Sequence, residues 1–275
     1  MTLVLVFLAL GYMRGWLRIH ASCAQAIDAW RAVGFLLGLG LIGMAVASPL
    51  ASGDAHSLTA HMIQHLVLMS LAPPLIWLAD PVRLLAWALP SRLTESVILP
   101  IARWRPSQRL AGFLGHPFVC WVAATAALAV WHVPAMLTLS AHSNGWHATE
   151  HASFLAGGLL FWWPVVQPWP SSAPERPWSI VLYLFLATLP CDALSGFLVF
   201  SERIAYPMYV SAPQVSAAVL DDQQRAGALM WTAVTILYLV AGVIVATRSL
   251  SRESLRVNKR SALQVAGDLQ TGLVP

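Results

Sequence analysis

Charged side chains are scarce in this sequence. Lys, Arg, Asp and Glu make up 10% of its 275 residues, whereas hydrophobic residues make up 58% and the mean hydropathy is +0.67. A soluble domain carries about 25% charged residues, so the composition excludes an ordinary soluble domain, and also a disordered, collagen-like or nucleic-acid-binding chain. We therefore expect a membrane protein. The thirteen Trp residues agree, because Trp gathers where hydrocarbon meets lipid headgroups.

Cysteine is equally sparse. Cys23, Cys120 and Cys191 lie far apart in the sequence and form no C-x-x-C pair. This spacing excludes a disulfide framework and a thioredoxin-like site. The net charge of +4 comes almost entirely from Arg in the short connections between apolar runs. Arg in such places indicates topology and not an anionic partner.

Seven apolar runs approach the roughly 20 residues that a helix needs to cross a bilayer. They are residues 2–19, 32–50, 57–78, 117–138, 146–166, 178–200 and 228–247. The sequence thus predicts an all-α, polytopic domain with seven transmembrane helices over residues 1–248, followed by a polar cytoplasmic tail over 249–275 that we expect to be mobile. Residues 79–116 mix Leu, Trp, Arg and Pro, which predicts an interfacial helix or a membrane-anchored linker.

The positions of Arg and Lys predict the orientation of these helices. Of the 16 basic residues, 14 fall in the first, third and fifth connections or in the tail, and only Arg203 and Arg225 fall on the other side. Basic residues are enriched on the cytoplasmic side of a membrane. We therefore expect the N-terminus outside and the C-terminus in the cytoplasm.

Five histidines fall at a similar depth near the outer ends of three predicted spans. His61 and His65 are four residues apart, as are His147 and His151, and this spacing places two imidazoles on one helix face. His132 lies at a similar level on another span. A buried His often only hydrogen-bonds a neighbouring helix. Imidazole is nevertheless the commonest metal ligand and suits copper, zinc and iron, so the group of five predicts a metal site.

Other side chains near the same level are further ligand candidates. A thioether favours Cu(I), although Met in an apolar helix more often serves packing. A carboxylate within a span needs a partner or a metal, whereas one in an outer connection can simply be solvated. The additional candidates are His56, Met62, Met69, Glu150, Cys191, Asp192 and Asp222.

His147, Glu150 and His151 also spell H-x-x-E-H. In inverted zinc metallopeptidases the two His of this motif bind zinc and the Glu activates water. Three fixed positions in five are common by chance, and Glu150 could instead orient a neighbouring His. The motif alone therefore leaves a zinc-dependent membrane peptidase as a minor alternative.

A set of motifs occurs in order along almost the whole chain. The set comprises Tyr12-Met13-Arg14-Gly15, His61-Met62-Ile63-Gln64-His65, Ala72-Pro73-Pro74, Trp131-His132-Val133-Pro134, His147 to His151 leading into Phe161-Trp162-Trp163-Pro164, Tyr206-Pro207, and Asp222-Gln223-Gln224 ahead of Met230-Trp231. In this order they resemble the multi-span CtaG family of bacterial cytochrome c oxidase assembly proteins.

The resemblance implies a non-enzymatic, multi-pass protein of the bacterial inner membrane that helps to insert copper into the oxidase. It also implies that oxidase subunits, periplasmic copper chaperones and membrane lipid are partners, and nucleic acid is not. By the resemblance, Asp222 and Gln223 lie near the outer mouth. The five histidines His61, His65, His132, His147 and His151 would handle the metal.

Two further functions stay open at this point. A haem-binding electron-transfer protein could use His65 and His132 as axial ligands on facing helices. A metal permease would need polar groups that continue across the bilayer, and only His116 and Cys120 lie near the cytoplasmic end.

Overall fold

The computed structural model describes residues 2–22, 28–47, 57–168, 177–209 and 216–271, and these form helices and no strand. The predicted all-α class is therefore confirmed. In chain order the elements are α1 (Thr2–Ser22), α2 (Ala29–Ala47), α4 (Leu58–Leu66), the π-helix η1 (Val67–Leu71), α5 (Ala72–Leu78), α6 (Pro81–Ala88), α7 (Ser91–Leu93), the π-helix η2 (Thr94–Ile98), α8 (Leu99–Arg103), α9 (Arg105–Leu114), α10 (Pro117–Trp131), α11 (Pro134–Ala141), α12 (Asn144–Val166), α13 (Pro177–Phe200), the 3-10 helix η3 (Pro207–Tyr209) and α14 (Ser216–Thr271).

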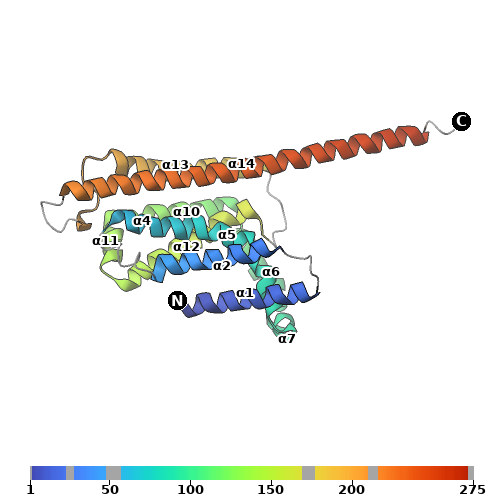
Figure 1. Ribbon diagram of the computed structural model, residues 1–275, viewed down its shortest axis with the longest axis horizontal. Helices are drawn as coiled ribbons and strands as arrows, with labels where there is room; N and C mark the ends of the chain where they lie inside the picture. Colours follow the sequence, from blue (N-terminus) through green and yellow to red (C-terminus); the bar gives the residue numbers. More distant parts are fainter. Residues whose placement is uncertain (1, 23–27, 48–56, 169–176, 210–215, 272–275) are drawn as a thin grey trace.

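The long helices form a bundle in which α13 and α14 run side by side, and α1 packs with α6 on the opposite side (Figure 1). The continuous helix formed by α4, η1 and α5 lies between two apolar cores. Met62 and Leu58 face the core made with α13 and α14, whereas Leu68 and Ala72 face the core made with α1 and α2. This central position lets one helix present side chains to both halves of the bundle.

Within the described part of the chain, five helices are long and apolar enough to cross a membrane. They span Thr2–Ala21, Ala29–Ala47, Leu58–Leu78, Trp178–Phe200 and Ala217–Ser251, and the bent pair α9 and α10 would make a sixth. The chain is therefore a multi-pass membrane protein. The 23-residue α12 is long enough to cross a bilayer, but its His and Glu side chains make it less apolar. The predicted count of seven and the orientation stay predictions.

The apolar run at 117–138 is not one helix, contrary to prediction. Helix α10 ends at Trp131, His132 and Val133 form the corner, and α11 begins at Pro134. Proline has no N–H and disfavours helical geometry in the residue before it, and Val133 is extended with φ −66° and ψ 127°. At 15 residues α10 is about 22 Å long, shorter than the hydrocarbon core. It meets α9 at 63°.

Residues 79–116 form several short helices, α6 to α9, where the sequence predicted an interfacial helix or a membrane-anchored linker. Helix α6 packs against α1, and its last carbonyls accept hydrogen bonds from two arginines of α1. Arg14 Nε donates to Ala88 O at 3.2 Å, and Arg18 Nη1 donates to Trp87 O at 3.2 Å. These arginines thus satisfy carbonyls at the C-terminal end of α6 that have no partner within the helix itself.

Helix α14 continues through the predicted boundary at residue 248. It runs unbroken from Ser216 to Thr271, 56 residues or about 84 Å, and its C-terminal part extends beyond the rest of the bundle (Figure 1). The polar tail expected to be mobile is therefore helical as far as Thr271.

A close approach of α12 to η1 brings the two histidine-bearing helices together. Pro73 lacks the N–H that would bond the carbonyl of Met69, and Trp162 Nε1 donates to that carbonyl instead, at 3.2 Å. The contact requires a glycine, because a Cβ on Gly158 would lie 2.5 Å from Met69 O. Gly158 therefore sets the spacing of the helices on which the candidate site depends.

Candidate metal centre

The two i,i+4 histidine pairs face each other across α4 and α12. The ring centroids of His61 and His65 lie 4.2 Å apart on α4, and those of His147 and His151 lie 4.2 Å apart on α12. Between the helices, the centroid distance is 6.1 Å from His61 to His147 and 6.0 Å from His65 to His151. His132 stands at the corner after α10, with its ring 6.0 Å from that of His65. The structure thus brings the five predicted histidines together.

Glu150 lies at the centre of this group and is completely buried. Its Oε1 is 3.3 Å from His61 Nε2, which donates to it, and 3.2 Å from His65 Nε2. Its Oε2 accepts a hydrogen bond from Ser140 Oγ. One carboxylate oxygen therefore lies close to two imidazole nitrogens of the facing helix.

These three side chains form a donor set that suits a metal ion. One ligand atom each from His61, His65 and Glu150 lies within 4.8 Å of the others. An ion with bonds of about 2.0 Å in tetrahedral geometry separates its ligand atoms by about 3.3 Å. The two distances to Glu150 Oε1, 3.3 and 3.2 Å, match that edge.

The hydrogen bonding around His65 supports the same conclusion. The side chain is only 5% exposed, yet neither Nδ1 nor Nε2 has a hydrogen-bond partner among the described residues. The approach of Nε2 to Glu150 is close but is not aligned as a hydrogen bond. Buried polar atoms are normally paired, so an unpaired imidazole beside a carboxylate fits a position where an ion binds.

Two residues of this cluster were missed from the sequence. Gln64 is completely buried, and His151 Nε2 donates to its Oε1 at 3.1 Å. Ser140, on α11, donates to Glu150. Gln64 lies between the two His of H-M-I-Q-H and so could have been suspected. Nothing in the sequence marks Ser140, because its contact depends on how α11 folds back onto α12.

His132 is fixed by contacts on both sides of its ring. Its Nδ1 lies 2.7 Å from Leu128 O, and its Nε2 lies 3.3 Å from Met62 Sδ. The backbone carbonyl of His132 accepts a hydrogen bond from Tyr206 Oη at 3.1 Å. Burial raises the pKa of Tyr206 to about 12, so this phenol stays a donor at neutral pH.

The remaining candidates lie at different places. Met62, Met69 and Cys191 line a cavity next to the histidines, whereas Asp192 is partly exposed and is not part of that lining. His56 lies outside the residues that the structure describes. His142 is exposed at the end of α11, where its Nδ1 contacts Thr138 O at 2.8 Å.

Asp222, expected near the outer mouth, contacts the first turn of α4. Its carboxylate accepts hydrogen bonds from Leu58 N at 2.6 Å and from Thr59 Oγ1 at 2.6 Å. The adjacent Gln223 joins α14 to the preceding segment, because its Oε1 accepts from Ala205 N at 2.7 Å. The Asp-Gln pair therefore holds the elements around the site in place, and a carboxylate at a helix N-terminus is stabilising there.

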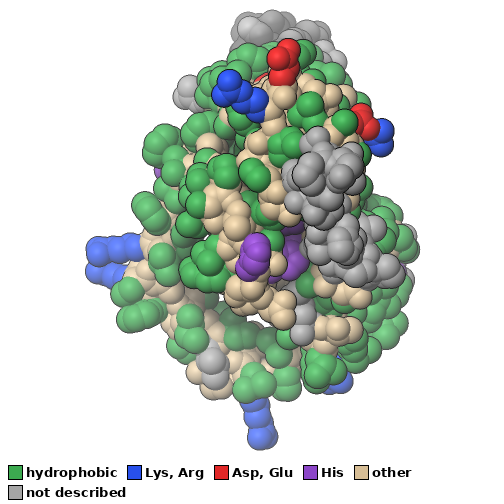
Figure 2. Space-filling view, turned by 90° about the vertical axis from the view of Figure 1, so that its left-hand side faces the viewer, with side chains coloured by type: hydrophobic (Ala, Val, Ile, Leu, Met, Phe, Trp, Pro, Cys, Tyr) green, Lys and Arg blue, Asp and Glu red, His purple; other side chains and the backbone are tan. Residues whose placement is uncertain are grey.

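Histidine side chains reach the surface at one end of the bundle. Figure 2 looks at the end where α11 and the start of α14 lie, and histidine side chains are visible at the surface near its middle. His147 is partly exposed, whereas His61, His65 and Glu150 lie behind it. His147 is therefore the most exposed of the five histidines.

Comparison with known proteins gives one family and three relatives. Residues 10–252 match the sequence model of the family described as cytochrome c oxidase caa3 assembly factor. The chain is 26% identical, over 93% of its length, to uncharacterized proteins of Mycobacterium bovis, Mycobacterium tuberculosis and Mycobacterium leprae. It spans 39% of the length of these relatives. No solved structure matches the chain.

Proposed function

The chain belongs to the cytochrome c oxidase caa3 assembly factor family, and we propose that it serves oxidase assembly by carrying copper in the cluster of His61, His65 and Glu150. In this proposal the ion is cargo that passes on to an oxidase subunit, and no bond is made or broken in a substrate. The observation that carries the proposal is the buried set of two imidazoles and one carboxylate with ligand atoms within 4.8 Å of one another.

The composition of the donor set also suits transfer. Three protein ligands leave a coordination position open, and an open position lets another ligand enter and take over the ion. The rings of His147 and His151 lie about 6 Å from those of His61 and His65, and His147 is partly exposed. They are placed to hand an ion inward to His61 and His65, or outward to a partner.

The geometry favours an ion over haem. The cavity beside His65 and His132 has a volume of about 40 Å³, whereas organic ligands occupy pockets of roughly 300–1,000 Å³. His132 Nε2 also contacts Met62 Sδ at 3.3 Å, and a planar haem would have to displace that side chain.

A metal permease and a zinc peptidase gain little support from the geometry. For a permease, His116 and Cys120 were the candidates at the far end, and both form local hydrogen bonds. Phe118 N donates to His116 Nδ1 at 3.3 Å, and Cys120 Sγ donates to Leu114 O at 3.0 Å.

For a peptidase, Glu150 would have to activate water, but its two oxygens already contact His61 and Ser140.

In this proposal the cluster lies at the outer face of the bacterial inner membrane, as the distribution of Arg predicts. Oxidase subunits on that side would receive the copper, and periplasmic copper chaperones would supply it. The end of the bundle in Figure 2 is then the docking side for both.

The experiment is complementation of a deletion strain with the full chain. His61→Ala removes one ligand, and we expect the oxidase to lose copper and activity while the variant stays in the membrane at normal abundance. His142→Ala removes an exposed histidine outside the cluster and is the matched control. Normal oxidase copper content in the His61→Ala strain would show that the proposal is wrong.

A further inference from the structure

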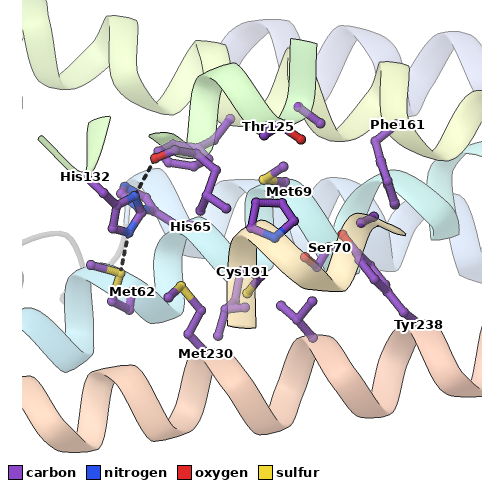
Figure 3. Close-up of a pocket in the computed structure, with 17 residues that line it drawn as sticks. Met62, His65, Met69, Ser70, Thr125, His132, Phe161, Cys191, Met230 and Tyr238 are labelled. Carbon is purple, nitrogen blue, oxygen red and sulfur yellow. Dashed lines mark hydrogen bonds between the residues drawn. The ribbon is translucent and has the colours of Figure 1, made fainter. Parts of the chain in front are cut away.

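A second group of metal-binding side chains lies on the other face of α4. Met62, Met69, Cys191 and Met230 come from α4, η1, α13 and α14, and all four line one cavity of about 40 Å³ together with His65 and His132. Figure 3 shows Met62, Cys191 and Met230, each on a different helix, among the residues that line the cavity. A water needs about 10–15 Å³, so the cavity has room for two or three waters or for a bare ion.

The tautomer of His132 turns a lone pair toward this cavity. A carbonyl oxygen can only accept, so His132 Nδ1 must donate to Leu128 O, 2.7 Å away. In a neutral imidazole the other nitrogen, Nε2, then carries a lone pair. Its contact is Met62 Sδ at 3.3 Å, and a thioether sulfur is also only an acceptor.

Two acceptor lone pairs that face each other form no hydrogen bond, and a positive species between them would satisfy both. An imidazolium could supply it, but His132 is 93% buried and the described residues offer it no carboxylate within ion-pair distance. A buried cation without such a partner is costly. A soft metal ion also carries a positive charge, but its coordination bonds to the imidazole nitrogen and to sulfur replace its hydration shell, whereas an imidazolium N–H that faces a thioether gains only a weak hydrogen bond.

We propose that this cavity is a second metal site that binds Cu(I), with His132 Nε2, Met62 Sδ and Met230 Sδ as its ligands and Cys191 as a further sulfur in its lining. Soft thioether and thiolate ligands select Cu(I), whereas nitrogen and oxygen ligands suit Cu(II) and zinc. The site takes from the proposed function only the identity of the metal.

The geometry leaves room for the ion. Metal bonds to imidazole nitrogen and to sulfur are about 2.0 and 2.3 Å long, so an ion between Met62 and His132 must move Sδ away from Nε2. Methionine has three rotatable bonds and adapts easily, and the cavity beside it can receive the displaced group.

The test titrates the full chain, purified in detergent without oxygen, with Cu(I) in competition with a chromophoric chelator, and separately with Zn(II). We expect Met62→Leu and Met230→Leu to weaken Cu(I) binding by about ten-fold or more and to leave Zn(II) binding unchanged. Leu has nearly the volume of Met, so these variants should fold. Met44→Leu, at an exposed position on α2, is the matched control.

X-ray absorption at the copper edge gives the second readout. Sulfur neighbours of copper should be present in the wild type and reduced in Met62→Leu. Unchanged Cu(I) affinity and sulfur signal in both methionine variants would overturn the proposal. If His61→Ala instead removes all bound Cu(I), copper has one site, and this proposal fails while the proposed function stands. If His61→Ala leaves Zn(II) binding intact while Met62→Leu weakens Cu(I), the sulfur site stands and the proposed function fails.

Discussion

The nitrogen and oxygen cluster and the sulfur-lined cavity lie on two faces of the same helix, and they differ in ligand type and in access. His61 and His65 turn toward α12 and meet the carboxylate of Glu150, behind a partly exposed His147. Met62 turns toward α13 and α14, contacts the imidazole of His132, and lines an interior cavity together with Cys191 and Met230. The first set suits Cu(II) or zinc, and the second suits Cu(I).

This difference shows that α4 presents two kinds of metal ligand, imidazole nitrogen and thioether sulfur, on different faces of a single turn. Residues 61 and 65 share a face because they are four apart, whereas residue 62 lies about 100° around the helix axis. His65 lines the cavity as well as the cluster, so it is the one histidine that touches both. Substitutions that change one face and spare the other therefore test whether two sites exist.

The largest effect is expected from Glu150→Gln. The amide keeps the shape of the side chain but removes the negative charge that both imidazoles of α4 face. We expect Zn(II) and Cu(II) binding to weaken by about 100-fold or more, because an anionic ligand is lost. Cu(I) binding in the sulfur-lined cavity should stay within experimental error. Competition titrations with each ion measure this, and an equal loss for all ions would mean that cluster and cavity are one site.

Gly158→Ala should damage both faces together. The new Cβ would lie 2.5 Å from Met69 O and 2.7 Å from Met69 Cα, so α12 must move away from η1. Such overpacking costs about 1–3 kcal/mol of unfolding free energy. Thermal unfolding in detergent should show a lower Tm, and both titrations should weaken.

The matched control for that variant is Gly196→Ala, where no heavy atom lies within 4 Å of the added Cβ. It should leave the Tm and both affinities close to those of the wild type. Equal behaviour of the two alanine variants would show that the contact at Gly158 does not set the spacing of the helices.

Ser140→Ala sharpens the comparison because it acts on the cluster from outside the ligand set. The variant removes the hydroxyl that donates to Glu150 Oε2, and loss of such a supporting hydrogen bond weakens metal binding by about ten-fold. Zn(II) titration measures the effect, and Cu(I) affinity should not change. Thr149→Ala is the control, because Thr149 is exposed and bonds only the carbonyl of Gly145 in its own helix. A loss of Zn(II) affinity equal to that of the control would contradict the assigned role of Ser140.

The sequence predicted the histidine faces well because that pattern is local. Spacing of four along a helix decides that His61 and His65 share a face, whatever the rest of the chain does. The break after Trp131 was also local, since Pro134 disfavours a helix through Val133, but the apolar character of the run outweighed that signal. The helical continuation of α14 beyond Arg248 was missed because the polar composition of residues 249–275 was interpreted as a mobile tail.

The partners of each face could not be predicted, since they depend on which helices pack together. Glu150 was expected as a possible orienting group for its neighbours on α12, whereas it contacts histidines 85 or more positions away, on α4. Cys191 and Met230 reach the cavity only because α13 and α14 pack along α4 and α10. One sequence contains no direct information on such long-range packing.

The smallest effect is expected from Asp222→Ala, which tests whether the Asp222 carboxylate is a metal ligand or a helix cap. The sequence made it a possible ligand, whereas the structure has it accept hydrogen bonds from Leu58 N and Thr59 Oγ1 at the start of α4. Loss of a helix cap costs about 1 kcal/mol, so Asp222→Ala should lower the Tm and leave Zn(II) and Cu(I) affinities unchanged. Asp221→Ala is the control, because Asp221 pairs with Arg225 on the exposed face of its own helix and such pairs contribute little. If Asp222→Ala instead removes metal binding at an unchanged Tm, the carboxylate is a ligand, and the cluster extends to the N-terminal end of α14.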